Sequence, residues 1–171
     1  MLERKTLTLE INGRREQAEV PANQTLLETL RDLGHFEVKS GCEKGDCGAC
    51  AVLVDGEALD SCLLLTWTVE GLPVTTVAGL EDDAVARPVL DAYVATGAAQ
   101  CGYCTPGFVI ATESLLRVNP GPSDEDVRVA LSGNLCRCTG YTKIFDAVHQ
   151  AAAGRGEEKR SCTTTISALS S

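Results

Sequence analysis

The amino-acid sequence predicts an α+β protein in which a small sheet-containing domain is followed by a helical domain. Three observations indicate this arrangement. The first half contains two hairpin signals, the second half shows helical spacing of apolar residues, and each half has its own group of four cysteines. The pattern changes within residues 78–85. We therefore predict domains at residues 1–80 and 81–154, followed by a tail at residues 155–171.

Two hairpins are predicted in the first half. Residues 6–11 alternate apolar and polar side chains, which is typical of a half-buried strand. The Asn-Gly pair at residues 12–13 is a strong two-residue turn signal, so residues 16–20 are expected to form the returning strand. The same pattern recurs around an Asp-Gly pair within residues 51–61. Residues 73–77 predict one more short strand.

A helix and a glycine-rich loop are expected between these hairpins. Leucines recur at helical spacing over residues 26–33, and Asn23 or Thr25 is a suitable N-cap. Gly34 is expected to end this helix. Residues 41–50 contain too many glycines for a regular helix or strand, so we predict a loop there.

Four helices are predicted in the second half. Proline near the first turn favours two of the helix starts, and Ser123 with Asp126 forms a capping-box pattern before a third. The expected helices cover residues 88–96, 106–118, 124–131 and 143–153. The tail beyond them is polar and shows no period, so we expect it to be flexible or to lie against a partner.

Net charge and hydropathy exclude several classes of function. The 171 residues contain 24 acidic and 15 basic side chains, for a formal net charge of −9. This excess of acidic groups argues against nucleic-acid binding and against anionic lipid surfaces. No segment approaches the ~20 apolar residues that a membrane-spanning helix needs, so no membrane insertion is expected. The N-terminus shows no apolar export segment, which favours a cytoplasmic protein.

Cysteine is the unusual component of this sequence. Nine cysteines occur beside two histidines and one methionine. Thiols stay reduced in the cytoplasm. This high number of cysteines therefore indicates metal or redox chemistry rather than disulfides. An odd number leaves at least one cysteine outside any fourfold site. Cys162 lies in the tail, and we expect it to have no ligand role.

The first cysteine group has the spacing of a plant-type 2Fe–2S site. Cys42, Cys47 and Cys50 form a C-x4-C-x2-C pattern, and Cys62 follows after eleven intervening residues. A zinc site is the alternative, but zinc sites usually use two close cysteine pairs that are far apart in sequence. Here one loop supplies three candidate ligands, which favours iron–sulfur chemistry.

The glycines of this loop support the same interpretation. Three thiolates from one tight loop converge only if the backbone coils around the bound group. This coiling requires positive φ angles and close backbone approach, which explains Gly41, Gly45 and Gly48. The N–H groups of such a loop are expected to point inward and hydrogen-bond to sulfur.

The second cysteine group combines two short motifs. Cys101 and Cys104 form a C-x2-C pattern, and Cys136 and Cys138 form a C-x-C pattern after thirty-one intervening residues. Each pair precedes a predicted helix, so two helix N-termini would direct N–H groups and positive dipole ends toward an anionic site. A zinc site with four cysteines is again the alternative. The neighbouring plant-type motif favours a second 2Fe–2S site.

Three motifs together resemble a known family. They are GCEKGDCGAC at residues 41–50, QCGYCTPG at residues 100–107 and GNLCRCTGY at residues 133–141. In this order they are similar to the small iron–sulfur subunits of the molybdenum hydroxylases, which include xanthine oxidase, aldehyde oxidase and carbon monoxide dehydrogenase. The resemblance covers roughly residues 5–153.

The resemblance implies a fold, cofactors and partners. The first domain would be a plant-ferredoxin-like β-grasp, and the second a four-helix bundle. Each would carry one 2Fe–2S cluster. The partners would be a large subunit that holds the molybdopterin cofactor and a medium subunit that holds FAD, assembled as a dimer of heterotrimers. Electrons would pass from molybdenum through the bundle cluster and the ferredoxin-like cluster to flavin.

The resemblance also implies roles for individual residues. Two groups of cysteines would be the metal ligands: Cys42, Cys47, Cys50 and Cys62 for the first cluster, and Cys101, Cys104, Cys136 and Cys138 for the second. Gln100 would hydrogen-bond the pterin, and Cys138 would be the ligand closest to it. The loop at Gly45 would face the flavin.

The sequence therefore predicts an electron-transfer subunit of an oxidoreductase complex. No nucleophile–base pair and no phosphate-binding loop is recognisable, so we assign no catalytic residue and expect no substrate turnover by this chain alone. The substrate of the complex is expected to be a purine or another N-heterocycle. Two alternatives stay open at this point: a free-standing two-cluster electron carrier and a zinc-stabilised interaction module.

Overall fold

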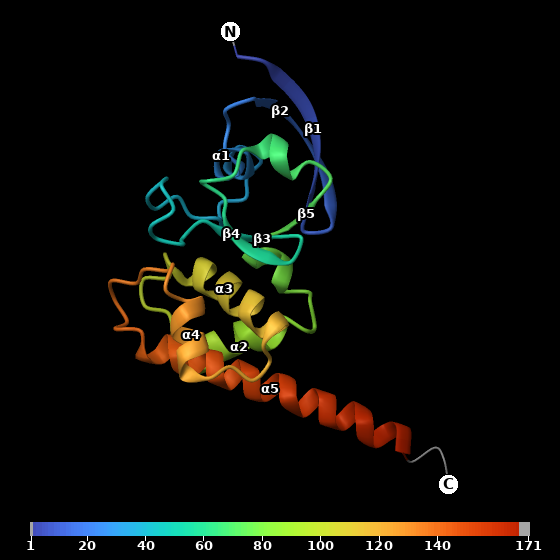
Figure 1. The fold of residues 1–171 in the computed structure, drawn as a ribbon, viewed down its shortest axis with the longest axis vertical. Coiled ribbons are helices and arrows are strands. Elements are labelled where there is room, and N and C mark those ends of the chain that lie inside the picture. Colours follow the sequence, from blue (N-terminus) through green and yellow to red (C-terminus); the bar gives the residue numbers. More distant parts are fainter. Residues whose placement is uncertain (1, 168–171) are drawn as a thin grey trace.

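The computed structural model describes the backbone of residues 2–167 and the side chains of residues 2–155. One half holds a five-stranded sheet with helix α1, and the other holds helices α2 to α5 (Figure 1). The strands are β1 (Arg4–Ile11), β2 (Arg14–Pro21), β3 (Ala51–Val54), β4 (Glu57–Asp60) and β5 (Pro73–Thr75), in the order β2-β1-β5-β3-β4. The predicted α+β class is confirmed.

Both hairpins form through the predicted turns. Asn12 and Gly13 have φ angles of 51° and 72°, and Asp55 and Gly56 have φ angles of 51° and 86°. Positive φ at both central residues is the requirement of a type I′ turn, whose twist matches that of the paired strands. The short strand β5 pairs in parallel with β1 and antiparallel with β3, so it joins the two hairpins into one sheet.

Helix α1 (Leu26–Asp32) covers one face of this sheet. Thr25 is its N-cap, and the Thr25 and Glu28 side chains form a capping box. The helix buries its leucines against the apolar face of β1, and each of the two elements contributes three buried residues to the first core. Its largest fully buried side chains are Leu7, Leu9, Ile11, Leu26 and Leu30.

The helical half contains α2 (Arg87–Ala95), α3 (Thr105–Val118), α4 (Asp124–Ala130) and α5 (Thr142–Ser167). Proline lies in the first turn of α2 and of α3, and Ser123 with Asp126 caps α4, as predicted. The second core is centred on Phe108 and Ile110 of α3. Ala51 and Leu53 of β3 join this core, so α3 packs against the sheet (Figure 1).

Two expectations about element boundaries were wrong. Helix α5 continues to Ser167 instead of ending near Ala153. Glycine costs a helix only about 1 kcal/mol per residue, and Arg155 is anchored in a buried ion pair with Glu113 of α3. Strand β5 ends at Thr75, since residues 77–80 form a 3₁₀ turn. A second 3₁₀ turn at residues 66–69 was not predicted. The side chain of Cys162 lies outside the described residues.

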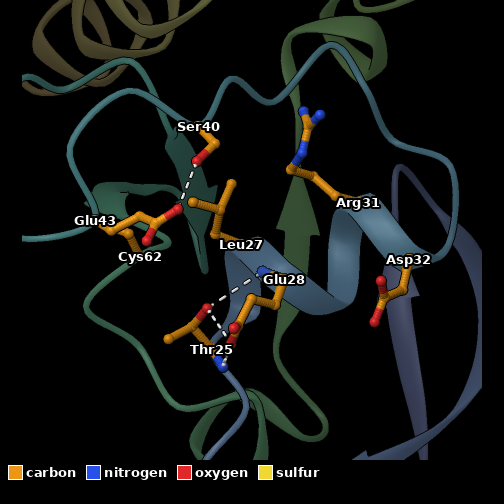
Figure 2. A pocket seen from close by; sticks show the side chains of 8 residues that line it. All are labelled: Thr25, Leu27, Glu28, Arg31, Asp32, Ser40, Glu43 and Cys62. Atoms are coloured by element: carbon orange, nitrogen blue, oxygen red, sulfur yellow. Dashed lines mark hydrogen bonds between the residues drawn. The ribbon is translucent and has the colours of Figure 1, made fainter.

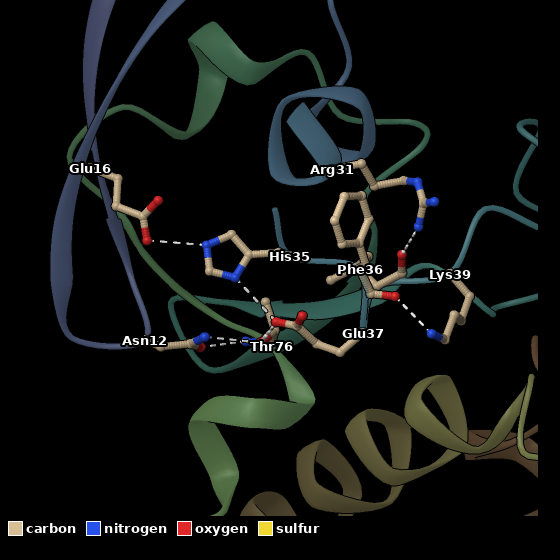
Figure 3. Close-up of polar contacts among 9 residues, drawn as sticks. Asn12, Glu16, Arg31, His35, Phe36, Glu37, Lys39 and Thr76 are labelled. Atoms are coloured by element: carbon tan, nitrogen blue, oxygen red, sulfur yellow. Dashed lines mark hydrogen bonds and ion pairs between the residues drawn. The ribbon is translucent and has the colours of Figure 1, made fainter. Parts of the chain in front are cut away.

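A partly buried polar network holds the segment that leads from α1 into the cysteine loop. The two ring nitrogens of His35 lie 3.1 Å from Glu16 and 3.1 Å from Glu37. Thr76 donates a 2.7 Å hydrogen bond to Glu37, and Asn12 accepts one from the Thr76 backbone N–H (Figure 3). This network connects β2 and the first hairpin turn to the chain just before the first cysteines. In the part of the chain that the structure describes, no helix is long and apolar enough to cross a membrane.

Candidate metal centres

The first cysteine group forms two adjacent pairs. The Cys42 and Cys47 thiols lie close enough to affect each other's pKa, and Cys62 lies close enough to Cys50 to affect the pKa of Cys50. Three of these residues come from the loop before β3, and Cys62 follows β4. The β3–β4 hairpin therefore folds the fourth cysteine back onto the loop. Cys50 and Cys62 are buried, whereas Cys42 and Cys47 are half-buried.

Backbone N–H groups of the loop point toward sulfur, as predicted. The Asp46 N–H donates a 3.3 Å hydrogen bond to Cys42 Sγ. The Lys44 N–H has the largest effect and, with Asp46, lowers the pKa of Cys42 to about 7. Burial instead raises the pKa of Cys50 to about 12. Amides directed at sulfur favour the thiolate, which is the form that binds metal.

The loop glycines act in two ways. Gly45 and Gly48 have φ angles of 81° and 66°, as the coiling of the loop requires. Gly41 does not have a positive φ. A Cβ atom at Gly41 would lie 2.6 Å from Cys47 Sγ, so this glycine provides close approach alone. Glu43 also has a positive φ of 57°, which the sequence did not indicate.

The second cysteine group is also paired. Cys101 Sγ and Cys138 Sγ are 3.7 Å apart, and the Cys104 and Cys136 thiols are neighbours. Cys104 is the N-cap residue of α3, and burial raises its pKa to about 12. For Cys136, burial raises the pKa, but hydrogen bonds from the Thr139 hydroxyl (3.1 Å) and N–H (3.4 Å) outweigh it and lower the pKa to about 7.

This pairing suits 2Fe–2S clusters better than single metal ions. Each of the two irons in such a cluster takes two cysteine thiolates, so four cysteines are expected as two pairs. A structural zinc ion instead draws four ligands around one point. The donor set therefore fits two binuclear clusters.

The two cysteine loops contact each other directly. The Leu135 N–H donates a 3.0 Å hydrogen bond to the Cys47 carbonyl, and the Asn134 side chain donates a 3.1 Å hydrogen bond to the Gly48 carbonyl. The Tyr103 hydroxyl also donates to the Ser40 carbonyl. Sequence reasoning assigned none of these contacts, because the partners are 63 to 88 residues apart and belong to different predicted domains.

The surroundings of the two groups differ. On the α1 side, a charged pocket reaches Cys62; its lining includes Glu28, Arg31 and Glu43 (Figure 2). At the other group, Gln100, Cys101 and Cys138 are exposed. Gly45 is half-buried against Leu63, whose own side chain is 60% exposed. Each cysteine group therefore has one side that the rest of the described chain does not cover.

Comparison with known proteins gives the family. Two family models match in tandem: a 2Fe-2S iron-sulfur cluster binding domain at residues 9–74 and a 2Fe-2S binding domain at residues 76–149. The nicotinate dehydrogenase small FeS subunit of Eubacterium barkeri is 42% identical over 85% of this chain and 94% of its own length. The chain belongs to the small iron–sulfur subunits of the molybdenum hydroxylases.

Other members of this family agree in sequence and in fold. The xanthine dehydrogenase iron-sulfur-binding subunit of Escherichia coli O157:H7 is 45% identical over 84% of this chain and 93% of its own length. A chain of the crystal structure of quinoline 2-oxidoreductase from Pseudomonas putida 86 superposes with a TM-score of 0.83 and 38% identity, covering 90% of this chain and 97% of that chain. As a small molybdenum hydroxylase subunit, this chain is an electron-transfer component of an oxidoreductase complex with a large molybdenum-binding partner.

Proposed function

We propose that this chain carries single electrons from a molybdopterin site in the large subunit to FAD in a medium subunit. The observation that carries the proposal is the arrangement of eight cysteines as two groups, each made of two adjacent pairs, in loops that hydrogen-bond to each other. The expected ligands are Cys42, Cys47, Cys50 and Cys62 for one cluster, and Cys101, Cys104, Cys136 and Cys138 for the other.

Bound 2Fe–2S clusters supply the chemistry, which is one-electron acceptance and release. The chain holds each cluster rigidly and sets its surroundings. Loop amides directed at Cys42, and the Thr139 donors directed at Cys136, stabilise negative charge on sulfur. Burial of Cys50, which is 2% exposed, keeps water away from one side of the first site.

The exposed residues suggest which side faces each partner. Gln100 and Cys138 are exposed next to the second group, which supports their assignment to the pterin of the large subunit. Gly45 and the exposed Leu63 lie at the first group, which supports contact with the flavin subunit there. The hydrogen bond from the Leu135 N–H to the Cys47 carbonyl connects the two ligand loops. It provides a short path for electron transfer through the protein from one loop to the other.

The same proposal covers the assembly and the substrate. We expect a dimer of heterotrimers in the cytoplasm, where the thiols stay reduced until they bind iron. Residues 1–80 would form a ferredoxin-like β-grasp domain, and residues 81–154 a four-helix bundle. Some relatives are named for nicotinate, xanthine or quinoline, which supports a purine or another N-heterocycle as substrate of the complex, whereas others are named aldehyde oxidoreductases.

Metal analysis and reduced-state EPR on the purified protein, with the subunits that accompany it, test this proposal. We expect about four iron atoms per chain, two distinct 2Fe–2S signals and co-purifying molybdenum. Iron with both signals but without a partner subunit would instead support the free-standing electron carrier. Zinc without EPR signals would overturn the electron-transfer assignment.

A further inference from the structure

Asn134 is a buried polar residue at the place where the two cysteine loops meet. Its residue exposure is 6%, and its Nδ2 donates a 3.1 Å hydrogen bond to the Gly48 carbonyl. Gly48 lies between the proposed ligands Cys47 and Cys50, and Asn134 lies two residues before the proposed ligand Cys136. The contact therefore joins the backbone of one ligand loop to a side chain of the other.

The Gly48 carbonyl lies in a confined space. A Cβ atom at Gly107, in the first turn of α3, would be 2.0 Å from this oxygen. A Cβ atom at Gly48 itself would be 2.3 Å from Asn134 Nδ2 and 2.7 Å from the Gly133 carbonyl oxygen. Real Cβ contacts do not reach such distances, so both positions require glycine for the loops to approach this closely. The side-chain amide of Asn134 occupies the space beside the Gly48 carbonyl and donates a hydrogen bond to it.

Further hydrogen bonds hold both Gly48 and Asn134 in place. The Gly48 carbonyl also accepts a 3.2 Å hydrogen bond from the Ala51 N–H at the start of β3. The Asn134 N–H donates 3.0 Å to the Leu131 carbonyl at the end of α4. The Tyr141 hydroxyl accepts 3.0 Å from the Cys136 N–H and lies 3.5 Å from the Asn134 carbonyl. Further hydrogen bonds thus support each side of the Asn134 contact.

We propose that Asn134 is a positioning residue that sets the distance and orientation between the two cysteine loops, and hence between the two clusters. This inference rests on the proposed function, because it needs both clusters to be present. A buried amide that loses its hydrogen-bonding partner destabilises the folded state, so the native structure retains the hydrogen bond from Asn134 to Gly48. While the Asn134 side chain is hydrogen-bonded to Gly48, the neighbouring Leu135 N–H stays aligned with the Cys47 carbonyl.

The test compares variants of the purified complex by reduced-state EPR at low temperature. Asn134→Asp keeps the shape of the side chain and removes the donor, and Asn134→Ala removes the donor without adding a charge. Asn23→Asp makes the same chemical change at an exposed position and is the matched control. The measured quantity is the magnetic interaction between the two reduced clusters, seen as splitting of their signals, because this interaction depends on distance and orientation.

We expect both Asn134 variants to keep the iron content and both 2Fe–2S signals of the unmodified complex but to lose or alter the splitting, while Asn23→Asp keeps it. Hydrogen exchange of the peptide over residues 133–136 should also become faster in both Asn134 variants. Unchanged splitting in both would overturn the proposal. Loss of a cluster in both would also count against it, since a positioning residue is not needed for cluster retention. If the unmodified complex shows no pair of 2Fe–2S signals, the proposed function fails instead.

Discussion

The backbone N–H of Leu135 donates a 3.0 Å hydrogen bond to the carbonyl oxygen of Cys47. Leu135 immediately precedes one proposed cluster ligand, and Cys47 is itself a proposed ligand of the other cluster. Two sites that lie in separate halves of the sequence are thus connected by a single backbone hydrogen bond. The two cysteine groups, the close contact at Gly107, the buried Glu113 and the Glu37 network lead to four predictions.

Replacement of single cysteines should separate the two sites. Cys42→Ser should abolish one 2Fe–2S EPR signal of the complex and leave the other, because it removes a thiolate from the first group only. Cys138→Ser should abolish the other signal for the same reason at the second group. Cys162→Ser is the control and should retain both. If either of the first two variants kept both signals, the division into two fourfold sites would be incorrect.

Gly107→Ala should destabilise the protein although alanine is the better helix former. The gain in helix propensity is about 1 kcal/mol. The added Cβ would lie 2.0 Å from the Gly48 carbonyl oxygen, and overpacking of this kind costs about 1–3 kcal/mol or more. We expect a net loss of stability in denaturant unfolding, together with weaker retention of iron.

The control for this substitution is Gly121→Ala. A Cβ atom at Gly121 has nothing within 4 Å, and its φ angle lies outside the left-handed region. This variant should therefore unfold at nearly the same denaturant concentration as the unmodified protein. Equal stability of the Gly107 and Gly121 variants would show that the α3–loop contact is looser than the structure indicates.

The buried carboxylate of Glu113 should be important for stability. It is fully buried, accepts a 2.8 Å hydrogen bond from Arg117 and forms an ion pair with Arg155 of α5. Breaking a buried ion pair by removing one partner costs about 3–5 kcal/mol, because the remaining charge is left uncompensated. Glu113→Gln should therefore lower the free energy of unfolding by an amount of this order, measured by chemical denaturation. Glu125→Gln, at an exposed pair with Arg128, should change it by less than about 1 kcal/mol.

The Glu37 network should make stability depend on pH in the acidic range. Burial raises the pKa of Glu37, but hydrogen bonds from Thr76 and the backbone, together with His35, outweigh burial and hold the pKa below its usual value. A carboxyl group with a lowered pKa in the folded state stabilises the protein above its unfolded pKa, near 4.5. This contribution is lost as the pH falls through the lower, folded-state pKa.

Thr76→Val tests this dependence, because it removes the 2.7 Å hydrogen bond to Glu37. We expect the folded-state pKa of Glu37 to rise and the acid-dependent part of the unfolding free energy to shrink, measured as denaturant midpoints at a series of pH values. Thr68→Val is the control, since the Thr68 hydroxyl bonds only within its own exposed turn, to Leu65. The same pH dependence in both variants would contradict a role for Thr76.

The local elements and the ligand chemistry could be predicted from the sequence. Asn12-Gly13 and Asp55-Gly56 specify their turns by themselves, and the capping boxes at Thr25 and Ser123 specify two helix starts. These signals act over four residues or fewer, so they are visible without a fold. The spacing of the cysteines likewise predicts two 2Fe–2S sites, because a loop that wraps a cluster needs ligands at fixed short intervals.

Only the tertiary structure decided how the two halves fit together. The contacts of Asn134 with Gly48 and of Arg155 with Glu113 join residues 86 and 42 positions apart. Neither contact has a periodicity or a spacing that local reasoning could detect. Nor could Gly107 be recognised as a contact glycine before α3 was placed against the first loop. Such relationships depend on how packed surfaces meet in space, and chain order alone does not determine that.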